Sequence, residues 1–225
     1  MKIIQSLIAS LLIFGTVGML FSGCALNKTK KGALIGAGGG AILGGVIGRA
    51  SGNTALGSLI GATVGGTTGA IIGNKMDKQA EEIKNTVPGA KVYRVGEGII
   101  VEFSDKILFG FDQSNLNASA ESNLNKLIAV LGKYPDTNIE IQGHTDNTGA
   151  DAYNLKLSKQ RATTVSRFIQ NGGVKGSRVN VKGFGESAPN YSNESEDTRA
   201  QNRRVEFLIS ANAKMRNEAE KAATK

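Results

Sequence analysis

The chain has little of the chemistry on which most catalytic and metal sites depend, because its 225 residues include one cysteine, one histidine and no tryptophan. A single cysteine, Cys24, excludes an internal disulfide, and in an exported chain an unpaired cysteine points to intermolecular pairing or to special chemistry. The lone His144 has no second histidine or cysteine near it, so the sequence offers no recognisable zinc site. A Ser-His-Asp hydrolase would need a positioned nucleophile, and the chain has no Gly-x-Ser-x-Gly turn. We therefore expect no metal, no cofactor and no catalysis, and a structural role for His144.

The net charge is unevenly distributed along the chain. It is formally +8, from 27 basic and 19 acidic residues. Five of the basic residues precede Lys75 and no acidic residue does, so the part from Lys75 onward holds 22 basic and 19 acidic residues, a balance of +3. Only 5% of the residues are aromatic, and no basic cluster is interleaved with aromatic side chains, which argues against a nucleic-acid partner.

The first residues of the chain have the pattern of a secretory leader. An apolar run over 3–21 follows a short positive start, and two small residues then precede Cys24. This arrangement resembles a bacterial lipoprotein signal, which implies a leader over 1–23, lipidation of the Cys24 thiol, and a basic linker over 24–31. By the same resemblance, Ala25 after the cysteine implies sorting to the outer membrane. The alternative is an uncleaved transmembrane anchor, because the apolar run approaches the ~20 residues that span a bilayer.

Between residues 32 and 73, glycine recurs at every fourth position in two series. These are Gly32, Gly36, Gly40, Gly44 and Gly48, then Gly57, Gly61, Gly65, Gly69 and Gly73. Such spacing places each series along one helical stripe, where another helix can approach closely. Turn residues at 51–54 predict a helical hairpin, and the pattern resembles the glycine-zipper segments of bacterial envelope proteins. Membrane insertion and self-association are predictions that follow. A partly disordered linker is an alternative, and a nucleotide-binding loop is disfavoured because no strand precedes the glycines.

The sequence from residue 91 to residue 212 has the periodicities of one α+β domain. Apolar alternation and helical spacing predict a strand or hairpin region over 92–103, helices over 116–131 and 151–171, and strands over 138–142, 178–182 and 204–209. Elements in the order β-α-β-α-β-β predict an α/β sandwich with helices on one face of a mixed sheet. Residues 74–90 are predicted to be a polar spacer with a short helix over 75–85, and residues 213–225 a frayed, charged helical tail.

The helix predicted over 151–171 carries a cation in an unusual place. Its inner stripe is predicted to contain Leu155, Ser158, Ala162, Val165 and Ile169. Arg161 lies at the edge of this stripe, in line with Asn154 and Ser158, and a desolvated cation needs a partner. Asp146, in the preceding loop, is the nearest candidate in sequence. An opposed acid and base suit a zwitterionic ligand, such as the free end of an amino acid; the alternative is an ion pair that only stabilises the fold.

Several motifs in this region occur in order. They are Gly-His-Thr-Asp-x-x-Gly from Gly143, Tyr-Asn-x-x-Leu-Ser-x-x-Arg-Ala-x-x-Val from Tyr153, Gly-x-Gly-Glu from Gly183, and Asn-Arg-Arg-Val-Glu from Asn202. Together they resemble the OmpA-like peptidoglycan-binding domain over roughly residues 95–212. The resemblance implies that Asp146 binds the ammonium and Arg161 the carboxylate of diaminopimelate in a peptidoglycan stem peptide. It also implies that the pocket is completed by Asn154, Leu157, Arg203, Asp112 and Asn115.

The resemblance as a whole implies a function outside catalysis. With the lipid signal and the glycine zipper, the chain resembles lipoproteins of the bacterial envelope. That implies a protein anchored through Cys24 in the outer membrane, facing the periplasm, which tethers this membrane to the cell wall. The alternative is a membrane-active or oligomerising glycine-zipper assembly protein that the wall-binding domain merely positions.

Overall fold

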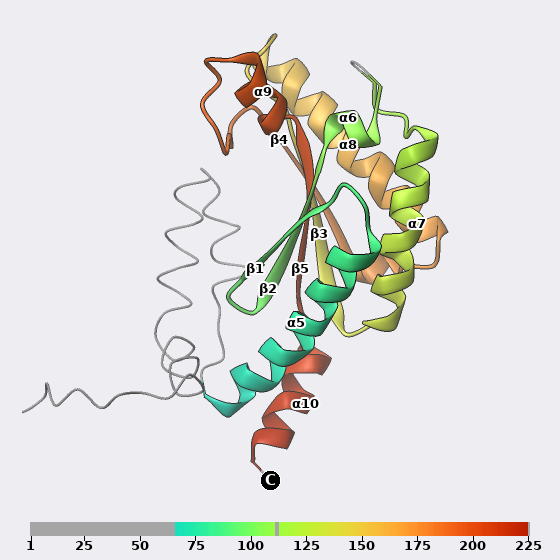
Figure 1. Ribbon diagram of the computed structural model, residues 1–225, viewed down its shortest axis with the longest axis vertical. Helices are drawn as coiled ribbons and strands as arrows, with labels where there is room; N and C mark the ends of the chain where they lie inside the picture. Colours follow the sequence, from blue (N-terminus) through green and yellow to red (C-terminus); the bar gives the residue numbers. More distant parts are fainter. Residues whose placement is uncertain (1–65, 111–112, 225) are drawn as a thin grey trace, which may run out of the picture. The chain divides into compact units, whose positions relative to one another are not determined.

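The computed structural model describes residues 66–110 and 113–224, which are drawn in colour in Figure 1. All of them belong to one contiguous unit of the chain. The predicted leader, the lipidation site and the glycine ladder as far as Gly65 lie outside the described residues. The predictions made for those segments stay predictions.

A mixed sheet of five strands forms the centre of the described region. The strands are β1 (Lys91–Val95), β2 (Gly98–Ser104), β3 (Thr137–His144), β4 (Val179–Gly185) and β5 (Arg204–Ala211), in the spatial order β1-β2-β5-β3-β4. Only β3 and β4 run parallel to each other; the other neighbouring pairs are antiparallel. The mixed sheet predicted from the sequence is therefore confirmed.

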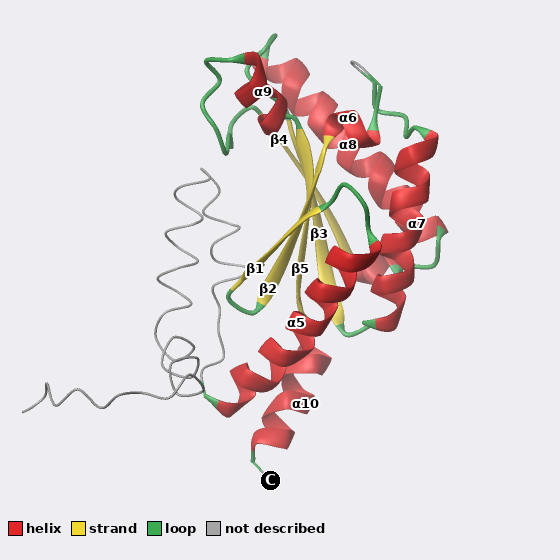
Figure 2. Cartoon of the chain, viewed as in Figure 1, coloured by secondary structure: helices red, strands yellow, loops and turns green. Residues whose placement is uncertain are grey.

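The helices that cover the sheet lie on one of its faces, as predicted. The described helices are α5 (Thr67–Thr86), α6 (Asp105–Leu108), α7 (Ala118–Lys133), α8 (Asp151–Asn171), a short 3₁₀ turn (Gly176–Arg178), α9 (Glu196–Asn202) and α10 (Ala213–Ala223). Figure 2 shows α7 and α8 side by side along the strands. Alternate strand residues such as Val101, Phe103 and Phe207 meet the inner faces of α5, α7 and α8 in the main core. The rings of Phe103 and Phe207 contact edge to face, 5.8 Å between centroids.

Two segments predicted to lie outside the domain are part of its core. Most of the predicted spacer belongs to helix α5, which begins before it, within the last residues of the glycine ladder. Ile72, Met76 and Ile83 of this helix are fully buried. The predicted frayed tail is helix α10, which is capped by the Asn212 side chain and packs its buried Met215 into the same core. Both segments are helical, but the prediction that they lie outside the domain was wrong. The narrow apolar stripes of α5 and α10 pack against each other and so become part of the core. None of the helices between residues 66 and 224 is long and apolar enough to cross a membrane.

Glycines of the predicted motifs let α8 lie close to the sheet. A Cβ atom on Gly143 would lie 2.0 Å from the backbone oxygen of Ser158, and one on Gly183 would lie 2.7 Å from the backbone nitrogen of Lys159. The Ser158 hydroxyl accepts a hydrogen bond from the N–H of Gly185 at 2.9 Å, and Gly185 has a φ of +55° that favours glycine. The motifs therefore fix the distance between α8 and the strands β3 and β4.

Candidate functional site

Several of the predicted ligand residues gather at one end of the sheet, where β2 and β3 end and β5 begins. His144 and Ser104, the last residues of β3 and β2, both pair with Arg204, the first residue of β5. Asp105, Asp146 and Arg203 each lie within two residues of these positions, so strand pairing brings them together. In Figure 1 this end of the sheet lies beside α6 and α9.

Four charged side chains of alternating sign form a row at this end. Arg161 contacts Asp105 at 3.6 Å, and Asp105 contacts Arg203 at 3.7 Å. Arg203 in turn donates a short hydrogen bond to Asp146. We call Arg161, Asp105, Arg203 and Asp146 the charge row. Arg203 also pairs with Glu196 of α9 at 2.7 Å, which extends the row to the surface.

The row corrects the pairing expected for Arg161. The expected partner was Asp146, in the loop before α8. The ion pair is made with Asp105 instead, and Asp146 is linked to Arg161 only through Asp105 and Arg203. The strand order explains the difference, because β2 lies next to β5 in the sheet and so brings Asp105 and Arg203 together. The backbone N–H of Asp105 bonds the carbonyl of Arg203 at 2.9 Å, which fixes this contact.

Arg161 is held by groups from several parts of the chain. It is 3% exposed, and its Nε donates to the carbonyl of Gln113 at 2.9 Å. Its guanidinium lies over the ring of Phe109, 5.3 Å from the centroid, which is within the range of a cation–π interaction. Phe109 and Gln113, which both follow α6, therefore contact this cation and set its position.

Asp146 is held in its turn by the backbone that follows it. Its carboxylate accepts from the N–H of Thr148 at 2.9 Å as well as from Arg203. Burial raises the pKa of Asp146, but the Thr148 N–H and the Arg203 guanidinium outweigh it, and the net pKa is lowered. Asn154 is 2% exposed and donates to the carbonyl of Thr148 at 3.1 Å and to Glu186 at 2.6 Å. Asn154 therefore positions the Asp146 turn.

Asp105 is a member of the site that the sequence analysis missed. Burial raises its pKa, and the attraction of Arg161 and Arg203 only partly offsets this effect. Its Oδ1 atom is buried and has no hydrogen-bond partner among the described residues. The other oxygen, Oδ2, contacts both guanidinium groups. An unpaired carboxylate oxygen beside such a pair can accept a hydrogen bond from a further donor. Its only signal in the sequence is an acid placed directly after an apolar strand.

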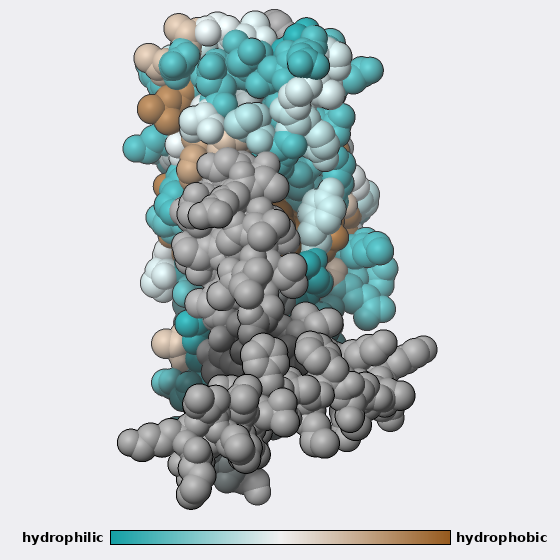
Figure 3. Space-filling model, turned by 90° about the vertical axis from the view of Figure 1, so that its left-hand side faces the viewer, coloured by the Kyte–Doolittle hydropathy of each residue, from teal (hydrophilic) through white to brown (hydrophobic). Residues whose placement is uncertain are grey.

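The charge row reaches solvent through Arg203 and its partner Glu196, whereas both ends of the row are buried. The side chains of Arg161 and Asp146 are 4% and 7% exposed, whereas those of Arg203 and Glu196 are 19% and 65% exposed. Figure 3 shows that the described surface at the end that carries α9 is mainly hydrophilic. A ligand that comes from solvent therefore meets Arg203 before it meets Asp146 or Arg161.

The remaining predicted residues differ in their positions. Leu157 is half-buried on α8, and Asp112 lies outside the described residues. Asn115 is exposed and lines a shallow depression with Glu121 and Arg167. It therefore faces the second half of α8, and the structure does not place it in the charge row.

His144 lies behind the site. It is 1% exposed and stacks on Phe184, with ring centroids 5.2 Å apart. Burial, together with the nearby Arg204, holds the pKa of His144 well below its ordinary value, so the ring is neutral at pH 7. Within residues 66–110 and 113–224, no cluster of three metal-binding side chains occurs.

Fold and site together define an α/β-sandwich domain with a row of paired charges at the end of a mixed sheet. The chain belongs to the OmpA family. The family model described as OmpA family matches residues 108–203, and the model described as YMGG-like Gly-zipper matches residues 1–77.

Similar proteins share the domain but differ in length. The outer-membrane lipoprotein YfiB of Pseudomonas aeruginosa is 34% identical over 115 residues, which cover 51% of this chain and 68% of YfiB. The peptidoglycan-binding protein ArfA of Mycobacterium tuberculosis is 38% identical over 103 residues, 46% of this chain and 32% of ArfA. The solved cell wall anchor of the T6SS from P. aeruginosa has a TM-score of 0.53 at 25% identity, covering 60% of this chain and 96% of that one. The chain spans only 16% to 35% of the length of three longer relatives, among them two outer membrane porins F.

Proposed function

We propose that the chain binds peptidoglycan without covalent attachment, through the amino-acid end of a stem peptide. The observation that carries this proposal is the charge row, which holds acids and guanidinium groups next to one another and reaches solvent through Arg203. A diaminopimelate side chain ends in an ammonium and a carboxylate on one carbon, so it needs both kinds of partner. The relative ArfA, whose name records peptidoglycan binding, supports the same ligand class.

Binding by this site is an exchange of ion pairs. In the described structure Asp146 is already paired with Arg203, and Arg161 with Asp105. The ligand ammonium takes the place of the Arg203 guanidinium on Asp146, and the ligand carboxylate bonds the guanidinium groups of Arg161 and the displaced Arg203. Charge-assisted hydrogen bonds contribute about 1.5–3 kcal/mol each, and the broken internal pairs offset part of this gain. The net affinity for one stem peptide is therefore modest and reversible.

A weak site suffices when the protein is held close to its polymer. Tethering raises the effective concentration of the second partner, and the wall presents many copies of the same peptide. We propose a lipid on Cys24 that anchors the chain in the outer membrane with the domain in the periplasm. The relative YfiB, named as an outer-membrane lipoprotein, supports this location. We further propose that the glycine ladder over 32–73 mediates self-association, because its stripe permits close helix contact.

The test is sedimentation of the full-length protein, kept in mild detergent, with purified sacculi. We expect the wild type to sediment with sacculi, and Asp146→Asn and Arg161→Gln to stay in the supernatant. Released stem peptide that ends in diaminopimelate should compete with sacculi for the wild type. Stem peptide with lysine at that position lacks the second carboxylate and should compete weakly.

A matched control exists at the opposite end of β3. Asp136 precedes β3 and pairs with Lys214 at 3.1 Å. In the same way, Asp146 follows β3 and pairs with Arg203. Asp136→Asn therefore removes a paired carboxylate of the same kind and should sediment like the wild type. Equal sedimentation of Asp136→Asn and Asp146→Asn would contradict the proposed site.

A further inference from the structure

Asp105 lies in the charge row beside the place that the proposed function gives to the carboxylate of the ligand. Its Oδ2 atom contacts Arg161 at 3.6 Å and Arg203 at 3.7 Å, the two guanidinium groups that are proposed to bind that carboxylate. A ligand group that bonds both of them therefore lies next to Asp105. Two carboxylates so close together repel each other, and burial strengthens the repulsion because little water screens it.

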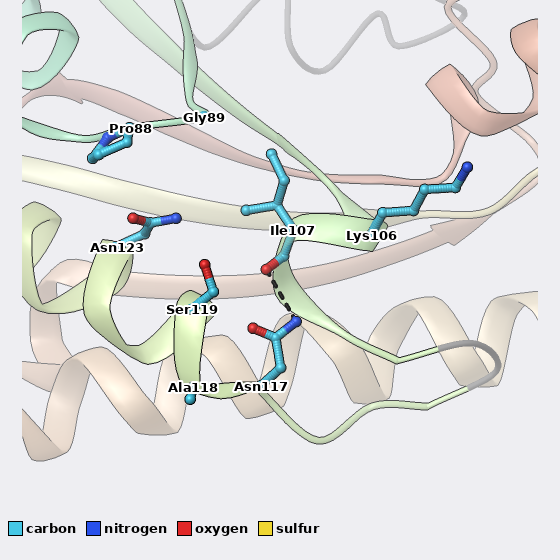
Figure 4. Close-up of a pocket in the computed structure, with 8 residues that line it drawn as sticks. All are labelled: Pro88, Gly89, Lys106, Ile107, Asn117, Ala118, Ser119 and Asn123. Carbon is cyan, nitrogen blue, oxygen red and sulfur yellow. Dashed lines mark hydrogen bonds between the residues drawn. The ribbon is translucent and has the colours of Figure 1, made fainter.

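The backbone of α6 fixes Asp105 in this place. The N–H of Asp105 bonds the carbonyl of Arg203 at 2.9 Å, and its own carbonyl accepts from the N–H of Phe109 at 2.7 Å. Figure 4 shows the side chain of Asn117 bonding the carbonyl of Ile107, at 3.2 Å, which ties α6 to the residue that caps α7. A ligand therefore meets the Asp105 carboxylate rather than displacing it.

The other carboxylate oxygen of Asp105 lacks a partner. Asp105 is 9% exposed, and its Oδ1 atom is buried without a hydrogen bond from any group in residues 66–110 and 113–224. A buried polar atom normally has a partner, because desolvating it without one costs free energy. An ionised ligand carboxylate offers no donor to this oxygen, whereas a carboxamide offers two N–H groups as well as a carbonyl acceptor.

We infer that Asp105 makes the site selective for stem peptides whose diaminopimelate is amidated at the carboxyl group of its ammonium-bearing carbon. The carboxamide nitrogen donates to Oδ1 of Asp105, and the carboxamide oxygen accepts from the guanidinium groups of Arg161 and Arg203. The ammonium group binds Asp146 as before. Each ligand group then meets a partner of the complementary kind. This inference rests on the proposed function and names the form of the ligand that the same site prefers.

The protonation of Asp105 adds a readout that is specific to this residue. Burial raises its pKa, and the charges of Arg161, Arg203 and Lys106 offset this effect only in part. The pKa of Asp146 is lowered, so Asp105 takes up a proton before Asp146 does as the pH falls. A protonated Asp105 is neutral and can donate to a ligand carboxylate. The preference for the amidated peptide should therefore decrease as the pH falls through the raised pKa of Asp105.

Two stem tripeptides that differ only in this amide test the inference. Full-length protein in mild detergent is titrated with each of them, and with the tripeptide that carries lysine in place of diaminopimelate. We expect the wild type at pH 7 to bind the amidated peptide about tenfold more tightly than the free acid. Both should bind more tightly than the lysine peptide, which has no carbonyl group at this position. The ratio of the first two affinities should decline when the titrations are repeated at successively lower pH.

Two variants test whether the preference depends on Asp105. Asp105→Asn should weaken both diaminopimelate peptides and abolish the preference, because an asparagine amide can donate to a carboxylate and accept from a carboxamide equally well. Glu196→Gln is the matched control, since it removes the same charge from another partner of Arg203. It should keep the preference, whatever its effect on the two affinities.

Each other outcome has a defined meaning. If the wild type binds both diaminopimelate peptides equally, or the free acid more tightly, this inference is wrong, and the proposed function stands as long as both exceed the lysine peptide. If neither exceeds the lysine peptide, the proposed function itself fails. A preference that survives in Asp105→Asn, that is lost in Glu196→Gln, or that does not change with pH would contradict the role of Asp105.

Discussion

Asp105 and Asp146 contact the same arginine, yet their pKa values are shifted in opposite directions. Asp146 has a lowered pKa, so it contributes stability above the pKa of its unfolded form, about 3.9, and loses it as the pH falls through the folded value. We expect Asp146→Asn to lower the free energy of unfolding by about 1–2 kcal/mol at pH 7. Denaturant unfolding at pH 7 and at successively lower pH should show this difference shrinking below pH ~4. A difference that is constant with pH would contradict the assignment.

Asp105 gives the opposite expectation. A raised pKa means that its ionised form reduces the stability of the fold, and that stability returns as the pH falls through the raised value. We expect Asp105→Asn to be at least as stable as the wild type at pH 7, with the two converging as the pH is lowered. The same variant should bind sacculi several-fold more weakly, because Arg161 and Arg203 lose the charge that aligns them. Reduced stability together with unchanged binding would show that Asp105 only stabilises the fold.

These residues also show what the sequence could predict about the site. Arg161 was recognised from helical spacing, because its position in line with Asn154 and Ser158 follows from local geometry, and all three are buried. Its pairing with Asp105 depends on the order of strands in the sheet, which no local pattern encodes. Asn115 was predicted to line the pocket but lies beside Glu121 and Arg167. It is in a loop, whose position no periodicity predicts. Leu155, predicted to face the core, is 51% exposed.

At the scale of elements, the contact between β3 and α8 depends on a missing side chain. A Cβ atom on Gly143 would lie 2.0 Å from a backbone oxygen of α8, which cannot move without the helix. We expect Gly143→Ala to lower the free energy of unfolding by about 1–3 kcal/mol. The control is Gly132→Ala in α7, where a Cβ atom meets nothing within 4 Å. It should instead raise stability by up to about 1 kcal/mol, because alanine favours a helix. Equal effects of the two changes in thermal unfolding would contradict the packing argument.

The helices and strands themselves were the best predicted feature of the fold, and the errors made about them share one cause. The strands and the helices α7 and α8 follow from apolar periodicity, and the structure confirms the sheet that they form. Helices α5 and α10 are mostly polar, and their few apolar residues were interpreted as spacer and tail. Each has a narrow buried stripe, Ile72 to Ile83 in α5 and Met215 to Ala219 in α10. These stripes become core because the two helices pack against each other and against the rest of the domain. A single helix pattern carries no information about such a partner.

At the scale of the whole molecule, α5 connects the two functional segments directly. It begins at Thr67, within the last turns of the glycine ladder, and ends at Thr86, five residues before β1. Its buried residues belong to the core of the OmpA-family domain. If the proposed function holds, any force between the membrane anchor and the wall is transmitted through this packed helix.

A tether requires both ends of the chain, which predicts two distinct failures. Full-length protein incorporated into fluorescent lipid vesicles should make the vesicles sediment with sacculi at low speed. With Asp146→Asn the protein should stay with the vesicles, and the sacculi should sediment without them. With Cys24→Ser, expressed without residues 1–23, the protein should sediment with the sacculi and leave the vesicles behind. Asp136→Asn should behave like the wild type. If the Cys24→Ser protein still captures vesicles, the glycine ladder itself holds the membrane, and the lipid on Cys24 is not the anchor.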